Sequence, residues 1–122
     1  MSSALRIAVS EEKGNVPVTI LHLTGDLDGK TYQELEAKAA EVIGAGASNL
    51  LFDLSGIGFM GSAGLRALHA ISNKIKTAGR GGSAGKMMLL NPTDAVSRVF
   101  KTLGFDQHFS IHTNLEEALK SF

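Results

Sequence analysis

The stretch NLLFDLSGIGFMGSAGLRAL, residues 49–68, decides the fold of this chain. Its first six residues, 49–54, are mostly apolar, as expected for a strand that is covered on both faces of a sheet. Glycines punctuate residues 55–61, which predicts a loop. Apolar residues then recur at helical spacing and predict a helix over 63–76 that begins at Ser62: Leu65, Leu68, Ile71 and Ile75.

Strand and helix patterns alternate along the rest of the 122 residues. Apolar, β-branched runs predict further strands at residues 5–9, 16–23, 87–91 and 108–112, and the polar segment SEEKGN joins the first two as a hairpin. With the helices between them, the order is β-β-α-β-α-β-α-β-α. This order predicts an α/β fold in a single domain, residues 1–122, with a mixed, largely parallel sheet and flanking helices.

Local signals mark the ends of the predicted helices. Thr31 followed by Glu34, and Thr113 followed by Glu116, have the spacing of a capping box at a helix N-terminus. Pro92 predicts the start of the helix that follows the fourth strand. Glycines predict the ends of two helices: Gly44 and Gly46 end the first, and Gly104 ends the helix after the fourth strand.

The composition excludes several classes of function. Lys and Arg number 12 together, as do Asp and Glu, so the chain lacks the basic excess of a nucleic-acid-binding domain. Without cysteine it has no disulfides and no thiolate metal site. The start MSSALRIAV does not resemble a signal peptide, and no apolar run approaches the ~20 residues that cross a bilayer. We therefore expect a cytoplasmic protein with no membrane insertion and no direct contact with nucleic acid.

The glycine-rich segment GRGGSAGK, residues 79–86, departs from a phosphate-binding loop. That motif needs a glycine where Arg80 stands and a hydroxyl residue where Met87 follows the lysine. The segment also precedes a predicted strand, whereas a phosphate loop follows one. We therefore expect a flexible surface connection here.

Two other possible sites, a serine nucleophile and a metal site, lack residues that they require. The segment MGSAG resembles a nucleophile elbow, but Met60 stands where that motif has its first glycine, and no histidine and acid are clearly placed beside Ser62. His108 and His112 would lie about 13 Å apart along a strand, too far to share a metal ion. We therefore expect no metal site and no cofactor.

Ser62 has two interpretations from the residues alone. A serine at an N-cap accepts a hydrogen bond from a first-turn N–H, typically worth ~1 kcal/mol. Because Gly61 and Gly64 have no side chains, the hydroxyl should also be accessible, and a helix N-terminus tolerates a phosphate. If the second and third strands are parallel neighbours, Asp26 and Asp28 should lie near Ser62; turn chemistry and a functional role both account for these acids.

The stretch that includes Ser62 resembles the signature of a known family. LLFDLSGIGFMGSAGLRAL resembles the signature of STAS domains, the anti-sigma factor antagonist family. LTGDLD, residues 23–28, resembles the Gly-Glu-Leu-Asp turn of that family, and residues 85–119 resemble its C-terminal half. The resemblance covers roughly residues 5–121. Two departures are Gly61, where an Asp or Ser is common, and the loop 79–86, which is longer than usual.

The resemblance implies a STAS-like fold and a regulator that is not an enzyme. In this family the unphosphorylated domain binds an anti-sigma factor, usually also a serine kinase, and frees the sigma factor. The kinase phosphorylates the motif serine and ends the complex, and a serine phosphatase resets it. Ser62 aligns with the phosphoacceptor and Asp28 with the turn acid. The predicted partner-binding surface comprises Asp26, Asp28, Gly61, Ser62, Ala63, Gly64 and Arg66.

Three alternatives stay open. Within the same fold, the chain would be an accessory subunit of a transporter or a signalling scaffold that binds a partner without a sigma factor. As an enzyme, it would be a hydrolase with Ser62 as nucleophile. As a ligand-binding domain, it would hold a small molecule or nucleotide at the glycine-rich loop. The oligomeric state is not determined by the sequence.

Overall fold

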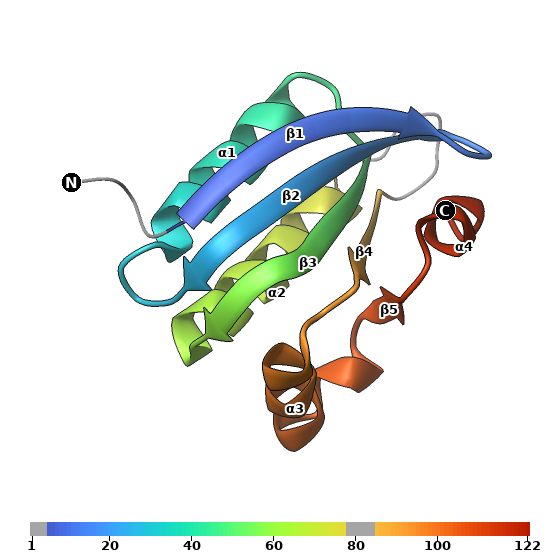
Figure 1. Ribbon diagram of the computed structural model, residues 1–122. Helices are drawn as coiled ribbons and strands as arrows, with labels where there is room; N and C mark the ends of the chain where they lie inside the picture. The colour runs from blue at the N-terminus through green and yellow to red at the C-terminus, as the bar shows by residue number, and fades with distance from the viewer. Residues whose placement is uncertain (1–4, 78–84) are drawn as a thin grey trace.

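Strand β3 is the centre of the sheet, and the other elements are arranged around it (Figure 1). The computed structural model describes residues 5–77 and 85–122. Five strands pair in the order β1-β2-β3-β4-β5, and only β1 and β2 are antiparallel. The predicted α/β fold with a mixed, largely parallel sheet is confirmed. Its elements are β1 (Leu5–Lys13), β2 (Pro17–Leu27), α1 (Tyr32–Gly44), β3 (Asn49–Met60), α2 (Ser62–Lys76), β4 (Lys86–Leu90), α3 (Asp94–Leu103), β5 (Ser110–His112) and α4 (Leu115–Lys120).

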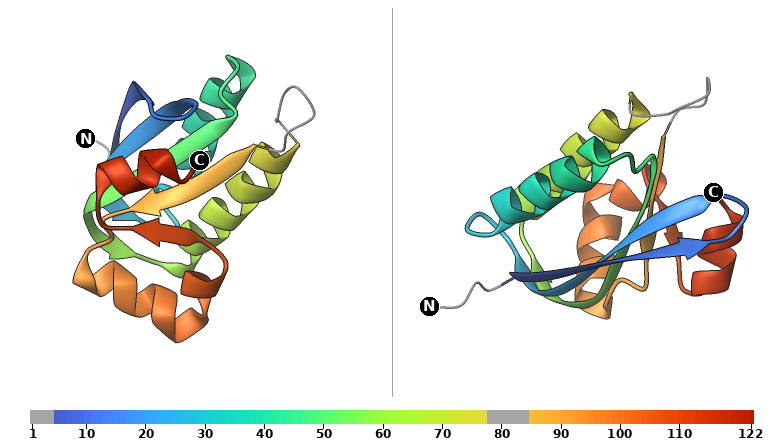
Figure 2. Two further views of the ribbon diagram at one scale, coloured as in Figure 1. Left: turned by 90° about the vertical axis from the view of Figure 1, so that its right-hand side faces the viewer. Right: turned by 90° about the horizontal axis from the view of Figure 1, so that it is seen from above.

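Helices cover the two faces of the sheet unequally (Figures 1 and 2). α1 and α2 lie side by side across one face, and α3 packs against the same large core. α4 covers part of the opposite face, over a smaller apolar cluster: Val18, Ile20, Leu51, Met88, Leu90 and Ala118. Because both clusters include residues of β3, this strand is buried on both faces, as its apolar sequence predicted.

The third strand is longer than the sequence predicted. β3 continues to Met60 and stays paired with β2, so the expected loop over 55–61 is wrong. The register of this pair shifts twice near Gly25, whose φ of 115° is a conformation that glycine adopts without strain. A Cβ at Gly56 would lie 2.7 Å from the carbonyl oxygen of Leu23, so the two backbones approach closely there. Glycines at these positions thus allow the irregular pairing of β2 with β3. Strands β1 and β2 are also longer than predicted.

Two predicted capping boxes are wrong. Thr31 is the N-cap residue of α1, but its hydroxyl makes no capping bond. It donates instead to the carbonyl oxygen of Asp26 (2.8 Å) and accepts from the N–H of Asp28 (3.0 Å). The helix predicted to begin at Thr113 has its N-cap at Asn114, whose side chain makes the capping bond. At the start of α1, therefore, hydrogen bonds to the chain just before the helix use the hydroxyl that the capping-box pattern assigned to the helix.

The second half of the chain follows its sequence pattern more closely. α3 begins after Pro92 with Thr93 as N-cap, and Gly104 ends it in the left-handed conformation at φ 75°. The last strand is shorter than predicted: His108 is the C-cap of a 3-10 turn over residues 105–107, and the strand begins only at Ser110. Apart from its last two residues, the glycine-rich segment 79–86 lies outside the described residues. None of the described helices has the length and apolar character needed to cross a membrane.

Gly64, near the start of α2, is a position where packing leaves no room for a side chain. A Cβ there would lie 2.8 Å from both the Cγ and the carbonyl oxygen of Leu27. Gly64→Ala should therefore lower the free energy of unfolding by ~1–3 kcal/mol, measured by urea denaturation. Gly44→Ala is the matched control, because no atom lies within 4 Å of a Cβ at that helical position and alanine favours the helix. Equal stability of Gly64→Ala and wild type would contradict this packing.

Candidate functional site

The carboxyl ends of β2 and β3 meet at one edge of the sheet, and the predicted site residues follow them (Figure 1). The pairing continues to Leu27 opposite Met60, and the N–H of Gly61 donates to the carbonyl oxygen of Leu27 at 2.9 Å. A Cβ at Gly61 would lie 3.6 Å from the Cβ of Asp28. The turn after β2 and the start of α2 at Ser62 are therefore neighbours, as parallel pairing of the two strands predicted.

Ser62 is the first residue of α2 and is not its N-cap, so the predicted capping role is wrong. The N-cap is Gly61, which has the extended backbone (φ −90°, ψ 176°) of that position. The Ser62 side chain is exposed, and its hydroxyl makes no hydrogen bond with any residue that the structure describes. The hydroxyl is thus accessible for modification, and the positive end of the helix dipole would tolerate a negative charge there.

The small residues around the start of α2 have different roles. Gly64 is buried and is required by close packing, not by access to the serine. Ala63 is buried as well, so neither residue presents a side chain to a partner. At Gly61 a Cβ would meet only ordinary contacts, the nearest being Phe59 Cε2 at 3.4 Å. A side chain therefore fits at Gly61, and its absence leaves space beside the serine.

The two acids of the predicted surface lie at the end of β2 and in the turn that follows: Asp26 is the next-to-last residue of β2, and Asp28 is the first residue after the strand. The carboxylate of Asp28 accepts a hydrogen bond from the N–H of Lys30 at 2.9 Å, a typical Asx turn. Asp26 lies opposite Phe59 in the strand register, with its Oδ1 3.8 Å from the position of a Cβ at Gly58. Both acids are half-buried. Turn formation accounts for the geometry of Asp28, and the two charges also border the surface around the serine.

Two further side chains stand on this surface. Phe59 is 55% exposed at the end of β3, and Arg66 is exposed one helical turn after Ser62. The sequence pattern included Arg66 but missed Phe59, because residues 55–61 were interpreted as a loop. The sequence feature that indicates Phe59 is a large aromatic residue within a glycine-rich segment. Exposed aromatic side chains are enriched at protein–protein interfaces, which makes Phe59 a candidate contact residue.

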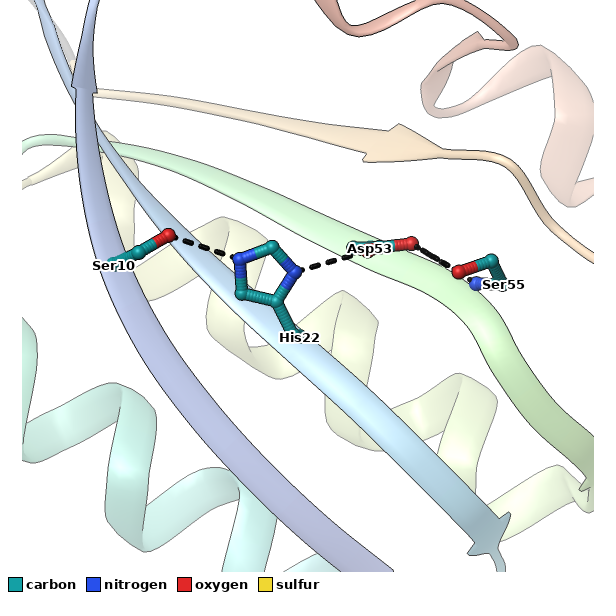
Figure 3. Close-up of polar contacts among 4 residues, drawn as sticks. All are labelled: Ser10, His22, Asp53 and Ser55. Atoms are coloured by element: carbon teal, nitrogen blue, oxygen red, sulfur yellow. Dashed lines mark hydrogen bonds and ion pairs between the residues drawn. The ribbon is translucent and has the colours of Figure 1, made fainter.

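A separate polar cluster crosses β1, β2 and β3 on the face of the sheet opposite α1 and α2 (Figure 3). His22 Nδ1 lies 3.0 Å from Asp53 Oδ2, and His22 Nε2 lies 2.9 Å from Ser10 Oγ. Asp53 Oδ1 accepts from the N–H and the hydroxyl of Ser55, at 3.1 and 2.8 Å. Partial burial by itself raises the pKa of Asp53, but the hydrogen bonds from His22 and Ser55 outweigh it and hold the pKa below its ordinary value.

This cluster has the serine–histidine–carboxylate order of a hydrolase triad, but it does not include Ser62. Its residues lie on three strands and meet only through the strand register, so no local sequence pattern indicates the cluster. Ser62 itself has no histidine partner among the described residues, so the hydrolase alternative lacks a general base at that serine. Across residues 5–77 and 85–122, no group of three or more His, Cys, Asp or Glu is placed to hold a metal ion.

Comparison with known proteins identifies relatives along almost the whole chain. The sequence model of the STAS domain family matches residues 8–118. The anti-sigma-F factor antagonist RsfB of Mycobacterium tuberculosis is 29% identical over 116 residues, which cover 95% of this chain and 88% of RsfB. The match thus includes both the β2 turn and the start of α2.

Solved structures are similar over the same range. A crystal structure of an anti-sigma factor antagonist from Mycobacterium paratuberculosis has a TM-score of 0.79 and 26% identity, over 96% of this chain and 92% of its own. The anti-sigma factor antagonist SpoIIAA in its unphosphorylated form has a TM-score of 0.73 and 23% identity, over 93% and 95% of the two chains. At that identity the SpoIIAA comparison shows a shared fold.

Because Ser62 does not cap α2, Ser62→Ala should change the stability of the fold little. Because the hydroxyl makes no hydrogen bond within the described structure, the free energy of unfolding should stay within about 0.5 kcal/mol of wild type in urea denaturation. Asn114→Ala is the positive control: it removes a cap that is formed, so it should cost ~1 kcal/mol. A loss for Ser62→Ala as large as that for Asn114→Ala would show that the serine caps α2 in solution.

The lowered pKa of Asp53 predicts a pH-dependent contribution to stability. Because the native pKa lies below the unfolded value, the ionised carboxylate stabilises the fold fully above about pH 4, and this contribution is lost as the pH falls through the native pKa. The difference in free energy of unfolding between wild type and Asp53→Asn should therefore be near its maximum at about pH 6 and shrink as the pH falls below about 4. Urea denaturation at several pH values would measure it. A difference that does not change with pH would contradict the interaction.

Proposed function

This chain belongs to the STAS domain family, and we propose that it is an anti-sigma factor antagonist whose unphosphorylated form binds an anti-sigma factor and so frees a sigma factor. The observation that carries the proposal is the exposed hydroxyl of Ser62, which makes no hydrogen bond at the first residue of α2. The names of RsfB and of the M. paratuberculosis protein, both matched over most of their length, support the same role.

Reversible phosphorylation of Ser62 is the proposed control. A serine kinase, which in this family is usually the anti-sigma factor itself, would modify the hydroxyl, and a serine phosphatase would restore it in the cytoplasm. The structures of SpoIIAA in unphosphorylated and phosphorylated forms support such a modification on this fold. Gly61 places no side chain beside the serine, so a kinase would have access to the exposed hydroxyl. The absence of a histidine beside Ser62 in the described structure favours an acceptor over a catalytic nucleophile.

The physics of the site explains how a phosphate would act on binding and leave the fold intact. Phosphoserine adds about −1.5 to −2 charges. The dipole of α2 offsets part of this charge locally, by roughly 0.3–1 kcal/mol, so the folded state should tolerate it. A docked partner would have to desolvate the dianion close to Asp28, which opposes binding. A penalty of about 1–3 kcal/mol would weaken binding about 5- to 150-fold.

Phe59 supplies the apolar part of the proposed contact surface. It is the large hydrophobic side chain beside Gly61, and it is 55% exposed. Aromatic anchors often carry a large share of the binding energy at interfaces. With Asp26 and Asp28 at its border, the surface combines an aromatic centre with a polar rim, which is the usual anatomy of a protein interface.

Charge at position 62 should weaken partner binding in proportion to its size. Against a purified anti-sigma factor encoded beside this gene, titration calorimetry should give the highest affinity for the unmodified chain and the lowest for a chain with phosphoserine at position 62. Ser62→Asp should be intermediate, because aspartate carries one charge on a shorter side chain.

Ser121→Asp is the matched control, since Ser121 is exposed after α4 on the other side of the molecule. It should bind like wild type. Equal affinities for the unmodified, phosphorylated and Ser62→Asp chains would contradict an electrostatic switch. No binding by the unmodified chain would contradict the antagonist role itself.

A further inference from the structure

A groove lies along α2 on the side where the helix meets the segment after α3. Its volume is about 340 Å³, and its lining combines basic, amide and apolar side chains: Arg66, His69, Ala70, Asn73, Phe105 and His108. Phe105 and His108 form one wall, with their rings edge to face and their centroids 6.0 Å apart. No carboxylate lines the groove. Its chemistry therefore suits an acidic side chain with an apolar stem.

Arg66 is the strongest charge in this groove, and it is available. It is exposed and makes no ion pair or hydrogen bond with any residue in the described parts of the chain. His69 and His108 are exposed on either side and add N–H donors. An arginine flanked by donors can hold a carboxylate through two parallel hydrogen bonds, and an aromatic wall would shield that pair from water.

The groove is on the same face of α2 as Ser62. Ser62, Arg66, His69 and Asn73 follow one another at helical spacing, so the arginine lies one turn beyond the serine. A phosphate on Ser62 would be within reach of the Arg66 guanidinium, because side chains four residues apart on a helix are neighbours. Guanidinium groups bind phosphates in a bidentate manner, so the modified serine and an acidic ligand in the groove would compete for the same cation.

We propose that this groove binds an acidic side chain of the anti-sigma factor through Arg66, and that phosphorylation of Ser62 releases the partner by engaging Arg66 with the phosphate. The inference rests on the proposed function and names the partner chemistry that the function leaves open. The phosphate acts in two ways: it withdraws the cation from the partner, and it repels the partner's carboxylate. Arg66 is thus a specificity residue for the partner and the local sensor of the modified serine.

The test compares charge reversal inside and outside the groove. In titration calorimetry against the same anti-sigma factor, Arg66→Ala should weaken binding on the order of 10-fold, and Arg66→Glu should weaken it further. His108→Ala, which removes part of the opposite wall, should also weaken binding. Lys13→Glu is the matched control: it makes the same change of charge at the exposed β1–β2 turn, at the other end of the sheet. It should stay within about 2-fold of wild type.

A second measurement examines the phosphate directly and needs no partner. With phosphoserine placed at position 62 during synthesis, the pH titration of its ³¹P signal should move to higher pH in Arg66→Ala, since the dianion loses a neighbouring cation. The loss of partner affinity on phosphorylation should also be smaller in Arg66→Ala than in wild type.

Each outcome decides between the two proposals. Binding by wild type with equal binding by Arg66→Glu would overturn the groove and leave the antagonist role intact. An unchanged ³¹P titration in Arg66→Ala would overturn the capture of the phosphate. Failure of wild type itself to bind the anti-sigma factor would overturn the proposed function, and the groove assignment with it. Circular dichroism melting of each variant, expected to match wild type because Arg66 is exposed, separates these results from misfolding.

Discussion

The candidate site depends on one constraint: β2 and β3 remain paired as parallel strands to their last residues. Leu27 is opposite Met60, and the N–H of Gly61 continues the contact with Leu27 after the strands end. Because parallel strands end at the same edge of a sheet, the acidic turn after β2 and the helix after β3 are brought together. Without this pairing, Asp28 and Ser62 would be separated in space as they are in sequence.

Close packing at the start of α2 explains why the serine is available. Gly64 has no space for a side chain against Leu27, and Gly61 takes the extended backbone of an N-cap. The start of the helix is therefore determined by packing and by backbone geometry, and Ser62 contributes no bond to it. Because the serine makes no hydrogen bond that stabilises the fold, its modification should change the free energy of unfolding little. The same arrangement separates stability from regulation in the proposed switch.

The charges around Ser62 are unevenly distributed, so a phosphate there would be repelled from one side and attracted to the other. Asp26 and Asp28 border the serine on the β2 side, whereas Arg66 lies one turn further along α2. A new dianion would be repelled by the two aspartates and attracted by the arginine. It would change the electrostatics of the surface over one helical turn, and no movement of the sheet is required. Binding to a partner is sensitive to such a change because interfaces remove water from charged groups.

The sequence by itself determined the order of strands and helices, the end of α3 at Gly104, and the proximity of Asp28 to Ser62. These features follow from local periodicity, turn residues and the rule that parallel strands end together. Only the tertiary structure decided that residues 55–60 are strand, that Thr31 bonds to the preceding turn, and that Ser62 is not a cap. The polar cluster of Ser10, His22 and Asp53 and the groove at Arg66 were also identified only from the structure. The strand over 55–60, the Ser10–His22–Asp53 cluster and the groove depend on cross-strand register or on contacts between segments distant in the chain. The bonds of Thr31 span only three to five residues, but the sequence pattern does not specify which of several nearby partners a hydroxyl will meet.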